Sequence, residues 1–75
     1  MSPEKLIHMA NQIATFFRVK PEAEAVPGIA AHINDFWEPR MRRQLLELIE
    51  AGGAGLDPLV VAAAPAIRRP AEAPA

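Results

Sequence analysis

The amino-acid sequence predicts an all-α protein, a small bundle of three to four short helices with a disordered C-terminal tail. Apolar residues recur at helical spacing, and proline and glycine divide the chain into segments of helix length. No segment alternates polar and apolar residues as a half-buried strand does. A length of 75 residues allows one domain. We place a single helical domain at residues 1–68 and the tail, rich in Pro, Ala and Glu, at residues 69–75.

The first predicted helix begins at Ser2-Pro3-Glu4 and ends near Val19. Serine is a favoured N-cap, proline fits the first helical position, and an acid in the first turn complements the helix dipole. One half of the helical wheel, an arc of about 180°, holds the apolar residues Leu6, Ile7, Met9, Ala10, Ile13, Ala14, Phe16 and Phe17. A helix that packs against one core needs a stripe of only about 100°. This helix therefore has apolar surface for two neighbours.

The second predicted helix runs from about Pro27 to Asn34. A residue that precedes proline is disfavoured in the α region, so Lys20-Pro21 and Val26-Pro27 both indicate breaks in the helix. Residues 22–25 lie between these breaks and have room for a single helical turn. The residues expected to face inward are Ile29, Ala30 and Ile33, with Val26 beside them.

Local signals also mark the ends of a third and a fourth predicted helix. The third is expected from Pro39 to about Ala51, with Asp35 as its cap and Gly52-Gly53 as its end. Asp57-Pro58 repeats the order of a cap followed by proline and starts the fourth helix. This last helix ends or kinks at Pro65, because proline lacks the N–H that continues the hydrogen-bond ladder.

Composition excludes several classes of protein. The chain has no cysteine, so it forms no disulfide and no thiolate zinc site. Eight Lys and Arg against nine Asp and Glu give a net charge of −1, which argues against nucleic-acid binding through bulk charge. A hydrophobic content of 51% argues against intrinsic disorder. We see neither a signal-peptide pattern nor an apolar run of about 20 residues that could cross a membrane, and we expect a cytoplasmic location.

The residues that could carry chemistry have simpler interpretations. His32, Asp35 and Glu38 would share a face of a continuous helix and could hold a divalent ion, but a proline break follows and Asp35 is expected to cap. The glycines at residues 52–55 lack the following Lys and Ser or Thr of a phosphate-binding loop. We therefore expect no catalytic, cofactor-binding or metal-binding residue in this chain.

Basic residues gather in the first turn of the third predicted helix, where the helix dipole disfavours positive charge. They are Arg40, Arg42 and Arg43. Arg42 falls inside the apolar arc of this helix, which leaves two interpretations. Its stem can cover apolar surface while its head reaches water, or its guanidinium can bind a carboxylate or phosphate of a partner. In the second case, Arg42→Ala weakens co-purification of the partner far more than it lowers helicity. The adjacent Phe36-Trp37 is open to the same choice between core and interface.

The central stretch is similar to the delta subunit of cytosolic, NAD-dependent, molybdenum-containing formate dehydrogenases. This stretch is His32-Ile33-Asn34-Asp35-Phe36-Trp37-Glu38-Pro39-Arg40-Met41-Arg42. Residues 6–14 and 52–59 resemble the same family, and the matches together cover most of residues 3–64. The central stretch is the most specific, because Trp, Pro and two acids rarely occur in this order by chance.

The resemblance implies properties that the residues alone do not indicate. Delta subunits of this family carry no redox centre and accompany a large alpha subunit. The alpha subunit holds a bis-molybdopterin guanine dinucleotide cofactor and iron–sulfur clusters, and beta and gamma subunits handle FMN and NAD. The delta subunit is associated with producing or keeping the active, cofactor-loaded enzyme. The absence of cysteine and the excess of apolar helix surface agree with such a role.

The sequence therefore predicts a non-catalytic accessory subunit that docks on the alpha subunit and binds no cofactor by itself. The residues expected to contact the partner are Asn34, Asp35, Phe36, Trp37, Glu38, Arg40 and Arg42. The alternatives are a small helical DNA-binding module, for which the basic residues are diluted by acids, or another protein-interaction module. A helix lying on a membrane surface is a further alternative, but the polar half of the first helix carries few basic residues.

Overall fold

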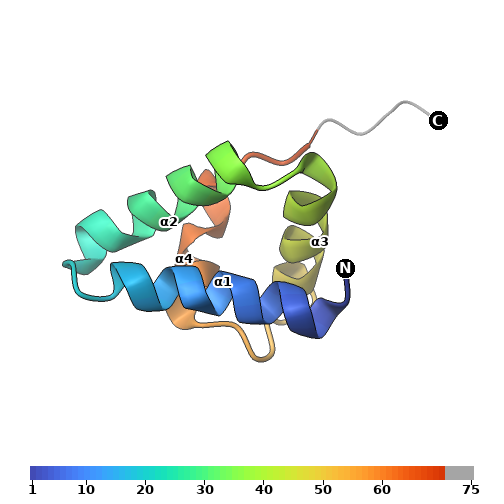
Figure 1. Ribbon diagram of the computed structural model, residues 1–75, viewed down its shortest axis with the longest axis horizontal. Coiled ribbons are helices and arrows are strands. Elements are labelled where there is room, and N and C mark those ends of the chain that lie inside the picture. The colour runs from blue at the N-terminus through green and yellow to red at the C-terminus, as the bar shows by residue number, and fades with distance from the viewer. Residues whose placement is uncertain (71–75) are drawn as a thin grey trace.

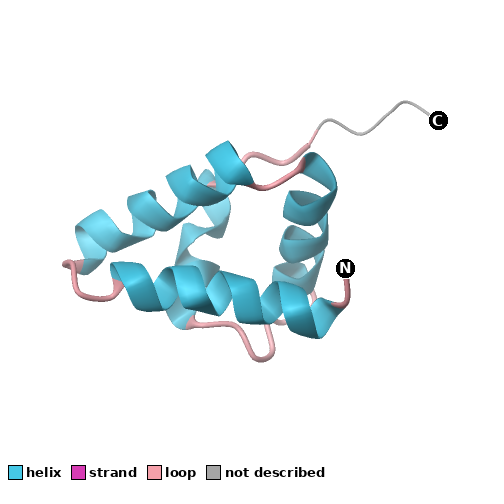
Figure 2. Ribbon diagram, in the orientation of Figure 1, coloured by secondary structure: helices cyan, strands magenta, loops and turns pink. Residues whose placement is uncertain are grey.

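The computed structural model describes residues 1–70, over which the chain forms helices and no strand (Figures 1 and 2). The elements are α1 (Pro3–Phe17), α2 (Glu22–Phe36), α3 (Pro39–Glu50), α4 (Pro58–Ala63) and the 3-10 helix η1 (Ala64–Ala66). The all-α prediction is confirmed. Of the predicted tail, residues 71–75 lie outside the described part of the chain. None of the helices in the described part is both long and apolar enough to cross a membrane.

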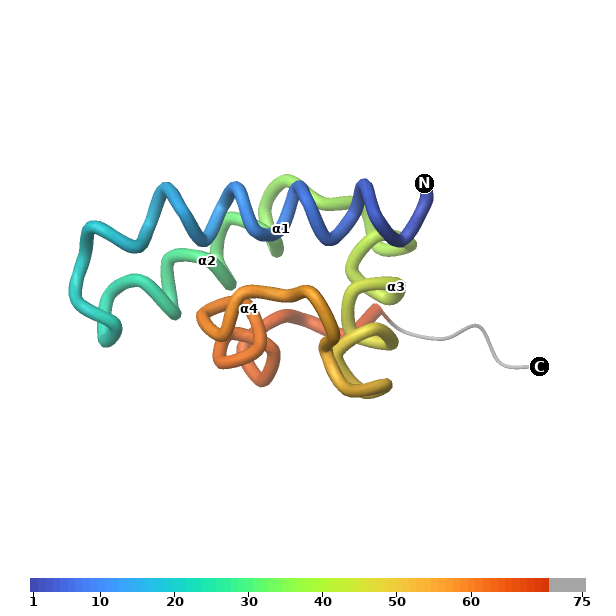
Figure 3. Tube along the Cα trace, turned by 90° about the horizontal axis from the view of Figure 1, so that it is seen from below, coloured from blue at the N-terminus to red at the C-terminus, as the bar shows by residue number. Residues whose placement is uncertain are grey.

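α1 and α2 form an antiparallel hairpin (Figure 1). The two helices diverge toward the N-terminal end of α1, and α3 crosses at that end of the hairpin. α4 and η1 lie behind the hairpin in Figure 1 and below it in Figure 3, and α4 packs mainly against α2. One side of the hairpin is thus covered by α4, whereas no helix of residues 1–70 crosses the opposite side.

Apolar residues from each α-helix meet in one core. The largest fully buried side chains are Leu6, Ile29, Ile33, Leu45 and Val60. Each of these contributes about 1.5–3 kcal/mol relative to an exposed position. On α1 the buried positions are Leu6, Ala10 and Ala14, which lie one helical turn apart. The two alanines leave room for neighbouring helices to approach α1 closely.

Two predicted N-caps and the predicted glycine stop agree with the structure. The Ser2 hydroxyl accepts a hydrogen bond from the N–H of Lys5 at 3.3 Å and caps α1. The Asp57 carboxylate accepts one from the N–H of Leu59 at 2.9 Å and caps α4. α3 ends just before Gly53, which has a φ of 68°. Glycine adopts this left-handed conformation without the steric cost that other residues meet.

The predicted start of the second helix at Pro27 is wrong. α2 begins at Glu22, after Pro21 as its N-cap, and continues through Pro27. Pro27 is exposed and lies in the first half of the helix, where water can hydrogen-bond the carbonyl of Ala23 that proline leaves without a helical partner. Packing on both sides of the proline holds the segment in one helix. The buried residues of α2 are Ala25, Ile29, Ala30 and Ile33.

The predicted cap of the third helix is also wrong. α2 extends to Phe36, so Asp35 is a helical residue and cannot cap α3. The N-cap of α3 is Glu38, whose side chain makes no capping hydrogen bond. α2 instead ends at Trp37, whose extended backbone turns the chain while its N–H donates to the carbonyl of Ile33 at 2.9 Å.

A polar network attaches the loop between α3 and α4 to α1. The side-chain amide of Asn11 donates to the carbonyl of Gly55 at 2.9 Å, and its oxygen accepts from the N–H of Asp57 at 2.8 Å. Arg18 also forms an ion pair with Asp57. These bonds fix the position from which α4 starts, and so they hold α4 against the back of the hairpin.

Candidate functional site

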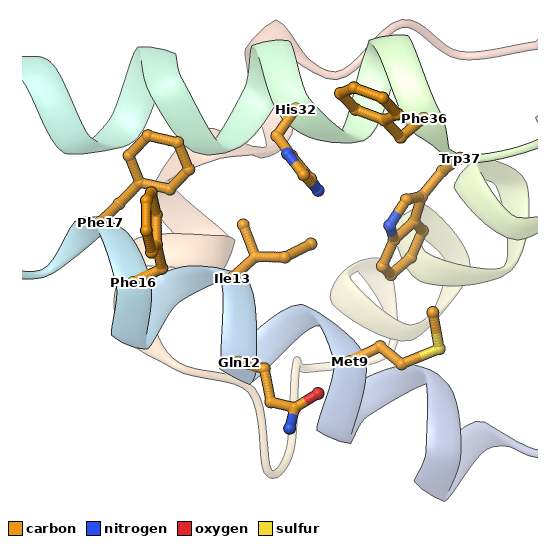
Figure 4. Close-up of a pocket in the computed structure, with 8 residues that line it drawn as sticks. All are labelled: Met9, Gln12, Ile13, Phe16, Phe17, His32, Phe36 and Trp37. Atoms are coloured by element: carbon orange, nitrogen blue, oxygen red, sulfur yellow. The ribbon is translucent and has the colours of Figure 1, made fainter.

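The two helices of the hairpin enclose an apolar groove with a volume of about 600 Å³ (Figure 4). α1 supplies one wall, and the C-terminal half of α2 with its cap residue supplies the other. The lining residues are Met9, Gln12, Ile13, Phe16, Phe17, His32, Phe36 and Trp37. A pocket of this size and apolar lining has room for an apolar ligand or for side chains of a partner.

The half-circumference apolar arc of α1 explains why one wall is apolar. Leu6, Ala10 and Ala14 use one edge of this arc for the core. Met9 and Ile13 lie nearer the other edge and are only partly buried, so they line the groove. The structure thus gives α1 one apolar side packed within the chain and a second apolar side along the groove.

The most exposed aromatic residues stand on opposite walls of the groove. Phe16 on α1 has 71% of its surface exposed, and Phe36 on α2 has 74%. Phe36 lies against the His32 ring at a centroid distance of 4.8 Å. Phe16 meets Phe17 edge to face at 5.2 Å. Exposed Phe side chains that gather at one site indicate a surface that binds a partner.

Gly28 allows the two helices to approach at the end of the groove lined by Phe17. A Cβ atom at position 28 would lie 2.5 Å from Cε1 of Phe17, well inside van der Waals contact. The Phe17 ring can therefore lie against the α2 backbone only because residue 28 is glycine. Any larger side chain there would move the ring and reshape this end of the groove.

The groove offers few polar groups. Gln12 and His32 are its polar lining residues, and the lining includes no charged side chain. In Figure 4 the His32 ring points from α2 toward α1. Among residues 1–70, no group of three or more His, Cys, Asp or Glu is placed to hold a metal ion. The geometry is suited to binding an apolar surface.

Two of the predicted contact residues make hydrogen bonds within the chain. The side-chain amide of Asn34 donates to the carbonyl of Ala66 at 3.0 Å, and its oxygen accepts from the N–H of Arg68 at 2.8 Å. Arg42 donates through Nη1 to the carbonyl of Trp37 at 2.8 Å and through Nε to the carbonyl of Arg68 at 3.1 Å. These two side chains hold the segment after η1 against the turn between α2 and α3.

The other predicted contact residues include one buried side chain and several exposed ones. Trp37 is 5% exposed, so its indole ring is part of the core and one face of it lines the groove. Phe36 is exposed on the groove wall, as an interface residue would be. Asp35, Glu38 and Arg40 are also exposed in the same short stretch. Their role as partner contacts stays a prediction.

The predicted contact residues include none on the α1 wall, although the apolar half of this helix was expected to pack partly inside the chain and partly on the partner. The residues involved are Met9, Gln12, Ile13, Phe16 and Phe17. Their signal was present in the sequence, because the apolar arc of this helix was wider than one core requires. What the sequence did not give was the position of α1 opposite Phe36, which depends on how the hairpin packs.

Comparison with known families agrees with the resemblance in the sequence. Residues 5–64 match the family model described as NADH-dependant formate dehydrogenase delta subunit FdsD. The match covers most of the chain and extends from α1 through α4, including both walls of the groove. The chain therefore belongs to the formate dehydrogenase delta-subunit family. A search of curated proteins gives no match.

Proposed function

We propose that this member of the delta-subunit family is a non-catalytic accessory subunit of a NAD-dependent, molybdenum-containing formate dehydrogenase. It docks on the catalytic alpha subunit and helps to form or stabilise the cofactor-loaded enzyme. The family supports membership of a formate dehydrogenase complex. The observation that carries the docking role is the groove, with exposed Phe16 and Phe36 on opposite walls.

The chemistry of the side chains supports a role without catalysis. The chain has no cysteine and so offers no thiolate ligand for an iron–sulfur cluster. The groove lining has no Lys or Arg to bind the phosphates of a molybdopterin dinucleotide or of FMN. These residues do not fit any of the three groups. In the proposal, the molybdenum cofactor, the clusters and FMN belong to other subunits of the complex.

Binding alone is sufficient for an accessory role. A subunit that binds the folded, loaded form of its partner stabilises that form by mass action, by about 2.7 kcal/mol when its concentration is 100 times its Kd. If the alpha subunit binds this chain more tightly when loaded than when empty, the chain shifts the population toward the loaded form by the ratio of the two affinities. No group of this chain then needs to contact the substrate.

The proposal is tested by removing the chain from its own cells. The remaining complex is purified, and its molybdenum content, formate-dependent NAD reduction and rate of thermal inactivation are measured. We expect a lower molybdenum content and faster inactivation, both restored by the wild-type chain and by a Val61→Ala control on α4. The Phe16→Ala/Phe36→Ala double variant should restore neither. A complex that is equally loaded, active and stable without the chain would contradict the proposal.

A further inference from the structure

The groove favours a helical occupant, because its walls have no free backbone. Along the groove the N–H and C=O groups of α1 and α2 are used within the helices, so an extended peptide could not add to them as a strand. Such a peptide would bury unpaired backbone groups against apolar side chains, at a cost of several kcal/mol. A helix satisfies its own backbone and presents side chains only. Helix-in-groove binding is the recognition mode that fits these walls.

The length of the groove sets the size of the occupant. On α1 the lining extends from Met9 to Phe17, which corresponds to about 12 Å at 1.5 Å per residue. Two to three turns of a partner helix cover this length. Such a helix presents two or three apolar side chains at spacings of three or four residues.

The outer edge of α2 is acidic. Four residues with helical spacing follow this edge beside His32 and Phe36: Glu24, Gly28, Ala31 and Asp35. Glu24 and Asp35 are exposed, and neither takes part in an ion pair within residues 1–70. The two small residues between them leave space for a close helix. A partner that lies along this edge gains most from basic side chains.

The outer edge of α1 carries its charges only in the first turn, where Glu4 and Lys5 stand together. Lys5 lies one turn before Met9, and both residues line a second, smaller depression that adjoins the groove at Met9. His8, Gln12 and Thr15 follow Lys5 on the exposed side of the helix. This edge carries no acid after the first turn. The groove therefore lies between one acidic edge and one edge that is polar but without net charge.

We propose that the groove binds one amphipathic helix of another subunit of the formate dehydrogenase complex. Large aliphatic side chains of this helix enter the groove between Phe16 and Phe36. Its basic side faces Glu24 and Asp35 on α2, and an uncharged polar side faces α1. This inference rests on the proposed function, because it takes the occupant from the same complex.

A second copy of the chain fits the groove less well. To fill it, the copy would need two or three large apolar residues exposed at helical spacing. The exposed large apolar residues of the described chain are Met1, Phe16, Val19, Phe36 and Val61. Two of these are the groove walls themselves, and the others lie singly on separate parts of the chain. Two grooves placed face to face would leave both unfilled.

Photo-crosslinking within the intact complex tests the occupant directly. p-Benzoylphenylalanine replaces Phe16 or Phe36 in the tagged chain, or the exposed Ala62 of α4 as the control. We expect positions 16 and 36 to crosslink to one segment of another subunit, a helix with aliphatic residues three or four apart and basic residues on one side. Position 62 should not reach that segment. Crosslinks to a second copy of the chain, or from position 62 alone, would overturn the inference.

Charge reversal tests the orientation of the helix. The Glu24→Lys/Asp35→Lys double variant should reduce the co-purified complex at least tenfold at low salt. The Glu47→Lys variant on α3 adds an exposed charge of the same sign away from the groove and should leave the amount unchanged. Equal recovery of both variants would overturn the assignment of charges. If the wild-type chain itself recovers no complex, the proposed function fails together with the inference; if it recovers complex without groove crosslinks, only the inference fails.

Discussion

Phe36 and Trp37 are neighbours in the chain but differ in what their side chains contact. Trp37 is packed in the core with 5% of its surface exposed, whereas Phe36 is 74% exposed on the groove wall. We expect Trp37→Ala to lower the free energy of unfolding by about 3–5 kcal/mol, because it leaves a cavity in a small core. Phe36→Ala should lower it by less than about 0.5 kcal/mol. Urea denaturation followed by circular dichroism measures both, and equal losses would contradict this assignment.

Arg42 is the residue whose interpretation changes most with the structure. Its guanidinium holds the carbonyls of Trp37 and Arg68, so it stabilises the turn between α2 and α3. We expect Arg42→Ala to lower the free energy of unfolding by about 1–3 kcal/mol, because both carbonyls lose a charged donor. Arg42→Lys, which keeps the charge but not the two-pronged geometry, should recover only part of the loss. An Arg42→Ala variant of unchanged stability that binds no partner would restore the interface interpretation.

At the scale of single residues, the apolar pattern predicted which side chains are buried. It did not predict which groups the polar side chains bond to. The apolar spacing correctly placed Ile29, Ala30 and Ile33 in the core. No pattern indicated that Asn34 bonds to residues 66 and 68, because those partners lie more than 30 positions away and are backbone groups of an irregular segment. The sequence therefore predicts Asn34 as a contact for another chain, whereas the structure uses its side chain within this chain.

At the scale of elements, α2 is where local propensity and packing disagree. Pro27 lies inside the helix, exposed, and breaks its hydrogen-bond ladder. We expect Pro27→Ala to raise the free energy of unfolding by about 1–2 kcal/mol, since alanine restores the N–H while losing some of the stiffness that proline gives the unfolded chain. Thermal unfolding of the two proteins measures the difference. A less stable Pro27→Ala variant would show that the proline sets a bend that the packing needs.

The other helices were predictable because their signals are short-range. A cap residue followed by proline starts α1 and α4, and Gly52-Gly53 follows α3. α2 had no such agreement. The break at Pro21 is real, but Pro27, six residues later, suggested a second break that packing overrides. The burial of Ala25, before the second of these prolines, could not be predicted from local signals, because it depends on how the whole of α2 packs.

At the scale of the whole molecule, the arrangement of basic residues argues against a DNA-binding module. Arg42 bonds within the chain, and Arg69 pairs with Glu50 at 2.7 Å. Arg18 pairs with Asp57, and the net charge is −1. A DNA-binding surface needs several free cations on one face. The exposed surface that remains unexplained within the chain is the aromatic groove.

The groove itself could be predicted only in part. The sequence indicated that the first helix has more apolar surface than one core uses, and it left Phe36 and Trp37 open between core and interface. It could not indicate that Phe16 and Phe36 line the same groove from opposite walls, because this depends on the divergence of α1 and α2 and on α4 filling the opposite side. Such features arise from the packing of elements distant in sequence.

The central claim, that this chain works as a docked subunit of formate dehydrogenase, is tested most directly by native purification of a tagged copy. The co-eluting proteins are identified by mass spectrometry, and molybdenum, iron and formate-dependent NAD reduction are measured in the same fractions. We expect a large complex that carries molybdenum and iron and reduces NAD with formate. Recovery of the chain alone, with no metal-bearing partner and no activity, would contradict the claim.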